Sequence, residues 1–171
     1  TFTTGGNTLT FTHLDRFTGG ANNQTLQLLS GATINSFDGG AGADTLDYSG
    51  YGAAVSLDVT GINFPNGHNG TATGLTSGFS NVNAVIGSAL ADAITGPNFD
   101  TSVTLTGTTT ATMTVTGVGL SLTAIESITT GTGNDTFTVN DGVAFDGTLA
   151  GATGTDTLDA SAYTAALAID I

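Results

Sequence analysis

Residues 37–59 read FDGGAGADTLDYSGYGAAVSLDV, and residues 149–171 read LAGATGTDTLDASAYTAALAIDI. Both stretches place a glycine-rich turn before the short run Thr-Leu-Asp, and both close on a second run in which apolar residues alternate with other residues. Alternation with a period of two is typical of a β-strand that buries one face. The two stretches therefore predict short strands separated by glycine turns.

The similarity extends over two copies of one unit, residues 1–59 and 112–171. Within them, LTFTHLDRFTGGANNQTLQL (9–28) lies over LSLTAIESITTGTGNDTFTV (120–139), with apolar positions in register. The intervening partial repeat, 60–111, contains a shorter echo, because FSNVNAVIGSALADAIT (79–95) matches residues 122–138. Repeats of this kind build folds by stacking equivalent units. We therefore interpret residues 1–171 as a single repetitive domain.

Two all-β architectures fit short strands in repeats without helical crossovers. A parallel β-solenoid, like a β-helix or β-roll, stacks each coil on the last. The alternative is an antiparallel β-sandwich, which needs longer units and hairpin turns. The short units favour the solenoid, with two or three strands in Thr101–Leu122 and with Tyr51 and Tyr163 packing onto the core from loops. The expected inward ladder comprises Leu26, Leu28, Leu46, Val55, Leu57, Phe137, Val139, Leu158, Leu167 and Ile169.

Composition excludes several functions. The chain has 171 residues, 14 acidic side chains and one basic side chain, Arg16, for a net charge of -13. Phosphate backbones would repel such a chain, so we expect no nucleic-acid partner. No apolar run is long enough to span a bilayer, so we expect no membrane insertion. Cysteine is absent, which excludes disulfides and thiol chemistry.

The most specific motif is Gly39-Gly40-Ala41-Gly42-Ala43-Asp44-Thr45-Leu46-Asp47. It fits the nine-residue pattern G-G-x-G-x-D-x-U-x, in which glycine carbonyls and a carboxylate offer hard oxygen ligands. It resembles the calcium-binding nonapeptide of RTX (hemolysin-type) proteins, and the wider unit resembles repeats of large secreted bacterial surface and adhesin-like proteins. The resemblance implies calcium at Gly39, Gly40, Gly42 and Asp44, and at Asp135 and Asp156. The turns before Asp135 and Asp156 each lack one glycine of the pattern. The alternative is that all are structural turns whose aspartates accept hydrogen bonds from backbone amides.

Other candidates for chemistry are few. His13 and His68 are the two histidines; we place His13 at a surface site and His68 at a loop tip, and assign a catalytic role to neither. The carboxylate pairs Asp44/Asp47 and Asp156/Asp159 could suggest glycoside hydrolysis. The pair recurs in both copies, however, whereas a catalytic site is normally built once. We therefore expect no catalytic residues.

These observations predict a non-enzymatic structural repeat of a secreted bacterial cell-surface stalk, filament or adhesin. The alternatives are a calcium-responsive RTX-like binding or secretion module, and a polysaccharide-processing β-helix enzyme. Neither end of the sequence shows a capping signal, so we expect head-to-tail self-association or continuation in a longer array. A surface polysaccharide is a further candidate partner, and calcium is the one candidate cofactor.

Overall fold

The computed structural model describes residues 2–4, 7–9 and 14–169, with side chains from Leu14 onward. This part of the chain is all-β and contains no helix. The strands are β1 (Phe2–Thr4), β2 (Asn7–Leu9), β3 (Arg16–Thr18), β4 (Thr25–Gln27), β5 (Ser36–Asp38), β6 (Thr45–Asp47), β7 (Ser56–Asn63), β8 (Gly67–Ala72), β9 (Leu75–Val82), β10 (Ala84–Ile86), β11 (Ala93–Thr95), β12 (Thr101–Leu105), β13 (Thr110–Val115), β14 (Val118–Thr123), β15 (Ser127–Thr129), β16 (Thr136–Val139), β17 (Thr148–Ala150) and β18 (Thr157–Asp159).

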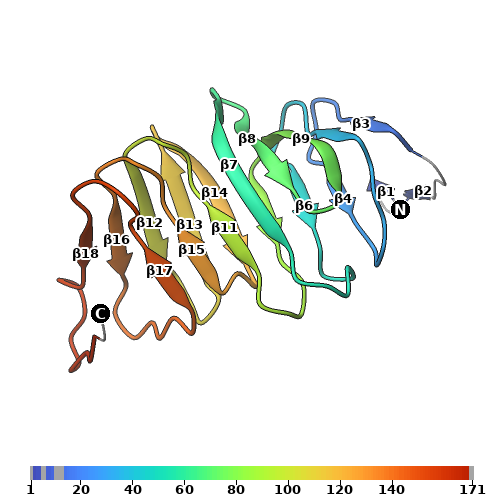
Figure 1. Ribbon diagram of the computed structural model, residues 1–171. Helices are drawn as coiled ribbons and strands as arrows, with labels where there is room; N and C mark the ends of the chain where they lie inside the picture. The colour runs from blue at the N-terminus through green and yellow to red at the C-terminus, as the bar shows by residue number, and fades with distance from the viewer. Residues whose placement is uncertain (1, 5–6, 10–13, 170–171) are drawn as a thin grey trace.

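The strands form two mixed sheets whose members follow one another along the long axis of the molecule (Figure 1). One sheet has the order β18-β16-β12-β13-β14-β10-β6-β4-β1-β2, and the other β17-β15-β11-β7-β8-β9-β5-β3. The chain passes back and forth between the sheets, so β3 and β5 pair in parallel in one sheet while β4 and β6 pair in parallel in the other. We call two such consecutive strands, one from each sheet, a rung.

Two antiparallel meanders interrupt this alternation. Strands β7, β8 and β9 form one meander, and β12, β13 and β14 form the other. In each, the middle strand runs opposite to its neighbours, while the outer strands pair in parallel with the rest of the sheet: β9 with β5, β7 with β11, β14 with β10 and β12 with β16. The three strands β12 to β14 confirm the prediction for Thr101–Leu122. The all-β prediction is confirmed, and both sheets mix parallel and antiparallel pairs.

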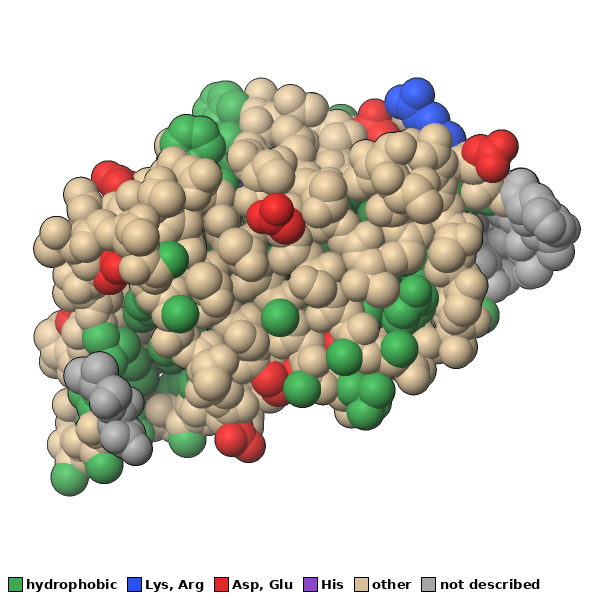
Figure 2. Space-filling model, in the orientation of Figure 1, with side chains coloured by type: hydrophobic (Ala, Val, Ile, Leu, Met, Phe, Trp, Pro, Cys, Tyr) green, Lys and Arg blue, Asp and Glu red, His purple; other side chains and the backbone are tan. Residues whose placement is uncertain are grey.

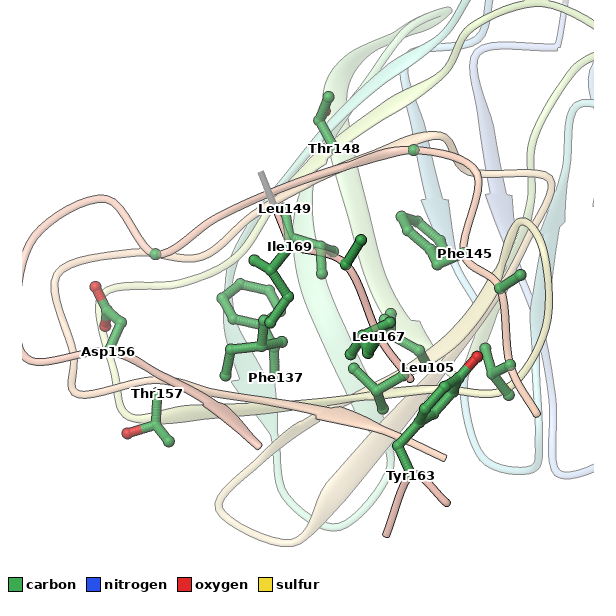
Figure 3. A pocket seen from close by; sticks show the side chains of 17 residues that line it. Leu105, Phe137, Phe145, Thr148, Leu149, Asp156, Thr157, Tyr163, Leu167 and Ile169 are labelled. Carbon is green, nitrogen blue, oxygen red and sulfur yellow. The ribbon is translucent and has the colours of Figure 1, made fainter. Parts of the chain in front are cut away.

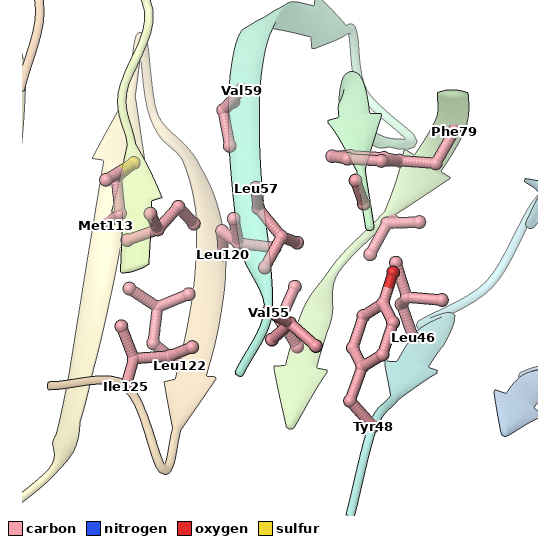
Figure 4. Packing of buried hydrophobic residues seen from close by; sticks show 14 of the residues in the cluster. Leu46, Tyr48, Val55, Leu57, Val59, Phe79, Met113, Leu120, Leu122 and Ile125 are labelled. Atoms are coloured by element: carbon pink, nitrogen blue, oxygen red, sulfur yellow. The ribbon is translucent and has the colours of Figure 1, made fainter. Parts of the chain in front are cut away.

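The alternating sequence explains which side of each strand is buried. In β6, Leu46 is fully buried, whereas its neighbours Thr45 and Asp47 are half-buried. Leu46 lies beside Leu26 of β4 and Val85 of β10, so side chains of one kind form a ladder across the strands. The ladders of both sheets meet in one hydrophobic cluster (Figure 4). Burial of apolar area on this scale is the main stabilising contribution to such a fold.

The tyrosines of the predicted loops pack onto this core, as expected. Tyr51 is buried and meets Tyr48 edge-on, with ring centroids 5.4 Å apart. The buried hydroxyl of Tyr48 donates a hydrogen bond of 2.7 Å to the Thr73 carbonyl oxygen. Tyr163, the counterpart of Tyr51 in the second copy, packs partly buried against the same cluster.

Strands occur at matching positions in the two aligned copies. The strands β3, β4, β5 and β6 of the first copy correspond to β15, β16, β17 and β18 of the second, with the same lengths except for one extra residue in β16. The turns agree as well, because the Tyr51 amide donates to the Tyr48 carbonyl and the Tyr163 amide donates to the equivalent Ala160 carbonyl. The two copies therefore offer pairs of equivalent residues in different surroundings.

Candidate functional site

The motif that suggested calcium lies in a turn that packs directly on its neighbour. Residues 39–44 connect β5 to β6 and stack on residues 19–24, which connect β3 to β4. The Ala41 amide donates a 2.8 Å hydrogen bond to the Gly20 carbonyl oxygen. Gly40 has a φ of 85°, and a Cβ there would lie 2.5 Å from the same oxygen. The glycines thus permit both a left-handed backbone and close contact between successive turns.

The aspartates of these turns use one carboxylate oxygen to bind a neighbouring rung. Asp44 Oδ1 accepts a 2.7 Å hydrogen bond from the Gln24 amide, and Asp135 Oδ1 accepts one of 2.7 Å from the Thr101 amide. Asp92 and Asp156 bind the amides of Val55 (2.6 Å) and Asp135 (3.0 Å) in the same way. Each aspartate immediately precedes a strand. We call these residues the pre-strand ladder.

The pre-strand ladder also includes residue types that the motif does not specify. The Asp44 amide donates to Asn83 Oδ1 at 2.9 Å, and the Asp92 amide donates to Glu126 Oε2 at 2.8 Å. Sequence reasoning missed Asn83 and Glu126, because an amide and a longer acid share no motif with aspartate. Their common signal is the position one residue before a strand, where the amide of the next rung needs an acceptor.

A second row of acceptors lies one residue earlier in each turn. Asn23 Oδ1 accepts from the Ala43 amide at 2.9 Å, and Asn134 Oδ1 accepts from the Thr155 amide at 2.9 Å. Asp100 directly precedes β12 but lies level with Asn134 of the next rung, and its Oδ1 accepts from the Asn134 amide at 2.8 Å. The polar side chains of the turns therefore connect successive rungs through two rows of side-chain-to-backbone bonds.

Two carboxylate oxygens of the ladder remain without a partner. Asp44 Oδ2 and Asp135 Oδ2 are buried and meet no hydrogen-bond donor among the described residues. At Asp92, by contrast, the amide of Ser88, four residues earlier, donates to Oδ2. The residue four before Asp44 is Gly40, and its amide donates instead to Asp38 Oδ1 at 3.1 Å. Burial raises the pKa of Asp44; the Gln24 amide acts against this rise, and the nearby Asp38 charge adds to it. Asp44 is thus a buried acid with one satisfied oxygen.

The aspartates predicted to bind calcium do not bring their carboxylates together at one place. Calcium takes six to eight oxygen ligands. Asp135 and Asp156 lie on adjacent rungs, while Asp44 lies between Gln24 and Asn83 on others. Within residues 14–169 no three acidic or histidine side chains are grouped to hold a metal ion. Gly39, Gly40 and Gly42 pack against the backbones of neighbouring turns, at Asn81, Gly20 and Asn22. No three acidic or histidine side chains among the described residues meet at one turn, and calcium binding through the glycine carbonyls and aspartates of the turns stays a prediction.

Two substitutions of Asp44 distinguish the contribution of its hydrogen bond to stability from the contribution of its charge. We expect Asp44→Ala to lower the free energy of unfolding by about 1–3 kcal/mol, because the buried Gln24 amide loses its acceptor. Asp44→Asn keeps an acceptor at Oδ1 and removes a buried charge, so we expect it to be at least as stable as the wild type at pH 7. Urea unfolding at pH 7 measures both, with the exposed Asp156→Asn as a control. An Asn variant as unstable as the Ala variant would show that the fold needs the charge itself.

The prediction for His68 is wrong. His68 lies in β8 and is fully buried, not at a loop tip. The hairpin turn occurs earlier, where the Asn66 amide donates to the Asn63 carbonyl. The flanking glycines suggested a turn, but Gly70 is there because β7 approaches closely: a Cβ at this position would lie 2.1 Å from the Asp58 carbonyl oxygen. His13 lies outside the described residues.

The buried His68 is unsuited to catalysis. Neither ring nitrogen makes a hydrogen bond of good geometry in the described part of the chain, although the Val82 backbone lies close enough to act on the ring. Burial lowers the pKa of His68 to about 4, with the Val82 backbone acting in the opposite direction. A neutral imidazole with no exposed surface cannot reach a substrate. We return to its effect on stability in the Discussion.

The hydrophobic core opens at the C-terminal end of the molecule. A cavity of about 860 Å³ lies between the last strands of the two sheets (Figure 3). Leu158, Leu167 and Ile169 line it and remain 43%, 40% and 54% exposed. They were predicted to belong to the buried inward ladder, and for these three residues that prediction is wrong: they line the cavity but stay exposed, because β17 and β18 have no further strand on their outer side among the described residues. We call these three residues the end face.

No protein-family model matches the chain, and no curated protein matches it. No helix in the described part of the chain is long and apolar enough to cross a membrane. The resemblance to RTX repeats consequently rests on the residues of the glycine turns, and the function must be argued from the contacts that these turns make.

Proposed function

We propose that this chain is a structural module, a non-enzymatic segment of a parallel β-solenoid in a secreted bacterial stalk, filament or adhesin. One observation carries the proposal: the carboxylates that suggested a metal site hold successive rungs together. Asp44, Asp135 and Asp156 each accept a hydrogen bond from a backbone amide of a neighbouring rung, at 2.7–3.0 Å. The strongest motif of the sequence therefore has an architectural use.

The stacking of the strands supports a solenoid with two inserted meanders. Outside the meanders and the antiparallel strands β1 and β2, the chain alternates between the sheets, and each strand pairs in parallel with the equivalent strand of the next rung, as β15 does with β17 and β16 with β18. Such a stack transmits force through every rung. The net charge of -13 keeps neighbouring rods solvated and apart.

The acidic surface agrees with this role. Figure 2 shows acidic side chains scattered over the visible face rather than gathered at one place, and the basic residue Arg16 lies in β3. A scattered distribution of like charges suits solubility at high density.

A calcium-responsive module is the second candidate, and the unpaired Oδ2 atoms of Asp44 and Asp135 favour it. A cation supplied by the medium, with water or further ligands, would satisfy both oxygens. If calcium bound only the folded chain, millimolar calcium would raise the unfolding temperature. The structural reading requires no such rise, because the rung-to-rung bonds form without metal.

Thermal unfolding with and without calcium tests the two candidates. We expect the chain to be folded in EDTA and the unfolding temperature to change by less than about 1 °C on adding 5 mM calcium, because a ligand that does not bind contributes no stabilisation. Magnesium at the same concentration controls for ionic strength. A chain that unfolds in EDTA and folds with calcium, but not with magnesium, would replace the structural role with the calcium-responsive one.

A further inference from the structure

The outer face of the ten-stranded sheet carries an array of hydroxyl groups over β13, β12 and β16, which are neighbours in that sheet (Figure 1). Beneath the array the core is closed, because Val103, Met113 and Phe137 of these strands are at most 5% exposed. The residues on either side of these three point outward, are exposed or half-buried, and all carry hydroxyls: Ser102, Thr104, Thr112, Thr114, Thr136 and Thr138. We call these six residues the threonine face.

The strand register arranges the threonine face in two rows. The rows consist of Thr112, Thr104 and Thr138, and of Thr114, Ser102 and Thr136. Neither pairing contains a register shift, whereas the pairings of β8 with β7 and β9 in the other sheet do. Neighbouring strands lie about 4.8 Å apart, and residues two apart in a strand are separated by about 6.7 Å. The six hydroxyl groups therefore form a regular lattice with two rows and three columns.

The threonine face is neutral although the chain is strongly acidic. The net charge is -13, yet β12, β13, β14 and β16 contain no charged residue. Elsewhere in the same sheet Asp47 lies on the outer side of β6, and Arg16, Asp38 and Asp58 lie in strands of the other sheet. The one aromatic residue of the four strands, Phe137, is buried. A neutral surface matches a neutral partner, and it has no exposed ring on which a sugar could stack.

The six hydroxyl groups are available to a partner outside the chain. Among the residues that the structure describes, no side-chain hydrogen bond involves any of them. Five of the six residues are threonines, whose branched side chain restricts rotation about χ1, so the sheet holds each hydroxyl and each methyl in place. The hydroxyl binds a water molecule, and the methyl limits the orientations open to the water beside it. The threonine face is thus suited to ordering a layer of water.

We propose that the threonine face binds the surface of ice, a function that goes beyond the proposed structural role and does not depend on it. The separation of about 4.8 Å between neighbouring strands is similar to the distance between water molecules one lattice step apart in hexagonal ice. A row of hydroxyl groups at this spacing holds a row of water molecules in positions that continue the crystal. A charged side chain would orient the surrounding water about itself, which agrees with the lack of charge on these strands.

Partition into slowly growing ice tests the proposal. A solution of the whole chain is frozen onto a cooled probe, and the protein content of the ice is compared with that of the remaining liquid. We expect the wild type to be enriched in the ice at least tenfold relative to Thr104→Glu, because residue 104 is the middle of one row. Thr129→Glu is the matched control, since Thr129 is half-buried like Thr104 but lies in β15 of the other sheet. We expect this control to partition like the wild type, and urea unfolding shows whether both variants fold.

Three outcomes would overturn the proposal. A folded wild type that is excluded from ice as completely as Thr104→Glu would show that the face does not bind ice. Equal losses in Thr104→Glu and Thr129→Glu would show that added charge acts without regard to this face. Retention on crystalline cellulose or chitin, lost in Thr104→Glu and without enrichment in ice, would assign the face to a polysaccharide instead. The structural role is tested separately, by unfolding in EDTA and calcium.

Discussion

Leu46→Ala is expected to lower the free energy of unfolding by roughly 3–5 kcal/mol, while the equivalent Leu158→Ala costs about 1 kcal/mol or less. Both leucines occupy the middle of a Thr-Leu-Asp strand, in β6 and β18. Leu46 is fully buried between Leu26 and Val85, whereas Leu158 is 43% exposed beside Phe137. Removing Leu46 leaves a closed cavity; removing Leu158 enlarges a cavity that is already open.

Urea unfolding at low protein concentration measures this pair, since the comparison concerns the monomer. Identical local sequence makes each variant the control for the other, because strand propensity and the unfolded chain change alike. Equal losses at the two sites would mean that Leu158 is covered in solution. If the loss at Leu158 grew with protein concentration, the covering partner would be a second copy.

The sequence predicted the positions of individual strands better than it predicted which strands pair with one another. The alternation around Leu46 and Phe137 identified β6 and β16, because an inward residue must be apolar whichever strand lies beside it. The meanders were harder, since the run from Thr101 to Leu122 is equally suited to parallel and antiparallel pairing. Pairing is decided by contacts distant in sequence, such as that of β12 with β16. The interrupted alternation of the sheets was consequently not foreseen.

The hydrogen-bond partners in the glycine turns also depend on contacts that are distant in sequence. Asp44, Asp135 and Asp156 were identified as chemically important, and the hydrogen bonds they make agree with the structural-turn alternative. Their partners could not be read from a motif, because an amide nitrogen has no sequence signal. Likewise, Leu158 has the sequence of a core residue, and its exposure depends on which strands lie beside β18, a contact that the local sequence does not specify.

Acidification from pH 6.5 to pH 4 is expected to remove about 3 kcal/mol of stability through His68, since each unit of pKa difference corresponds to about 1.4 kcal/mol. Burial lowers the pKa of His68 to about 4 in the folded chain, below the value of 6.5 for an exposed histidine. Between these values the unfolded chain binds a proton that the folded chain excludes. Folding is therefore favoured above pH 6.5, and this contribution is lost as the pH falls to 4.

Asp44 acts in the opposite direction, because its pKa is raised by burial and its protonation favours the folded chain. The contribution of His68 is isolated by measuring urea unfolding from pH 4 to pH 7 for the wild type and for His68→Leu, in which every other titrating group is unchanged. We expect the variant to lack the loss between pH 6.5 and 4, and to be at least as stable at pH 7, because two buried nitrogens without partners are removed. Parallel pH curves for the two proteins would show that His68 has a partner in solution that keeps its pKa near the ordinary value.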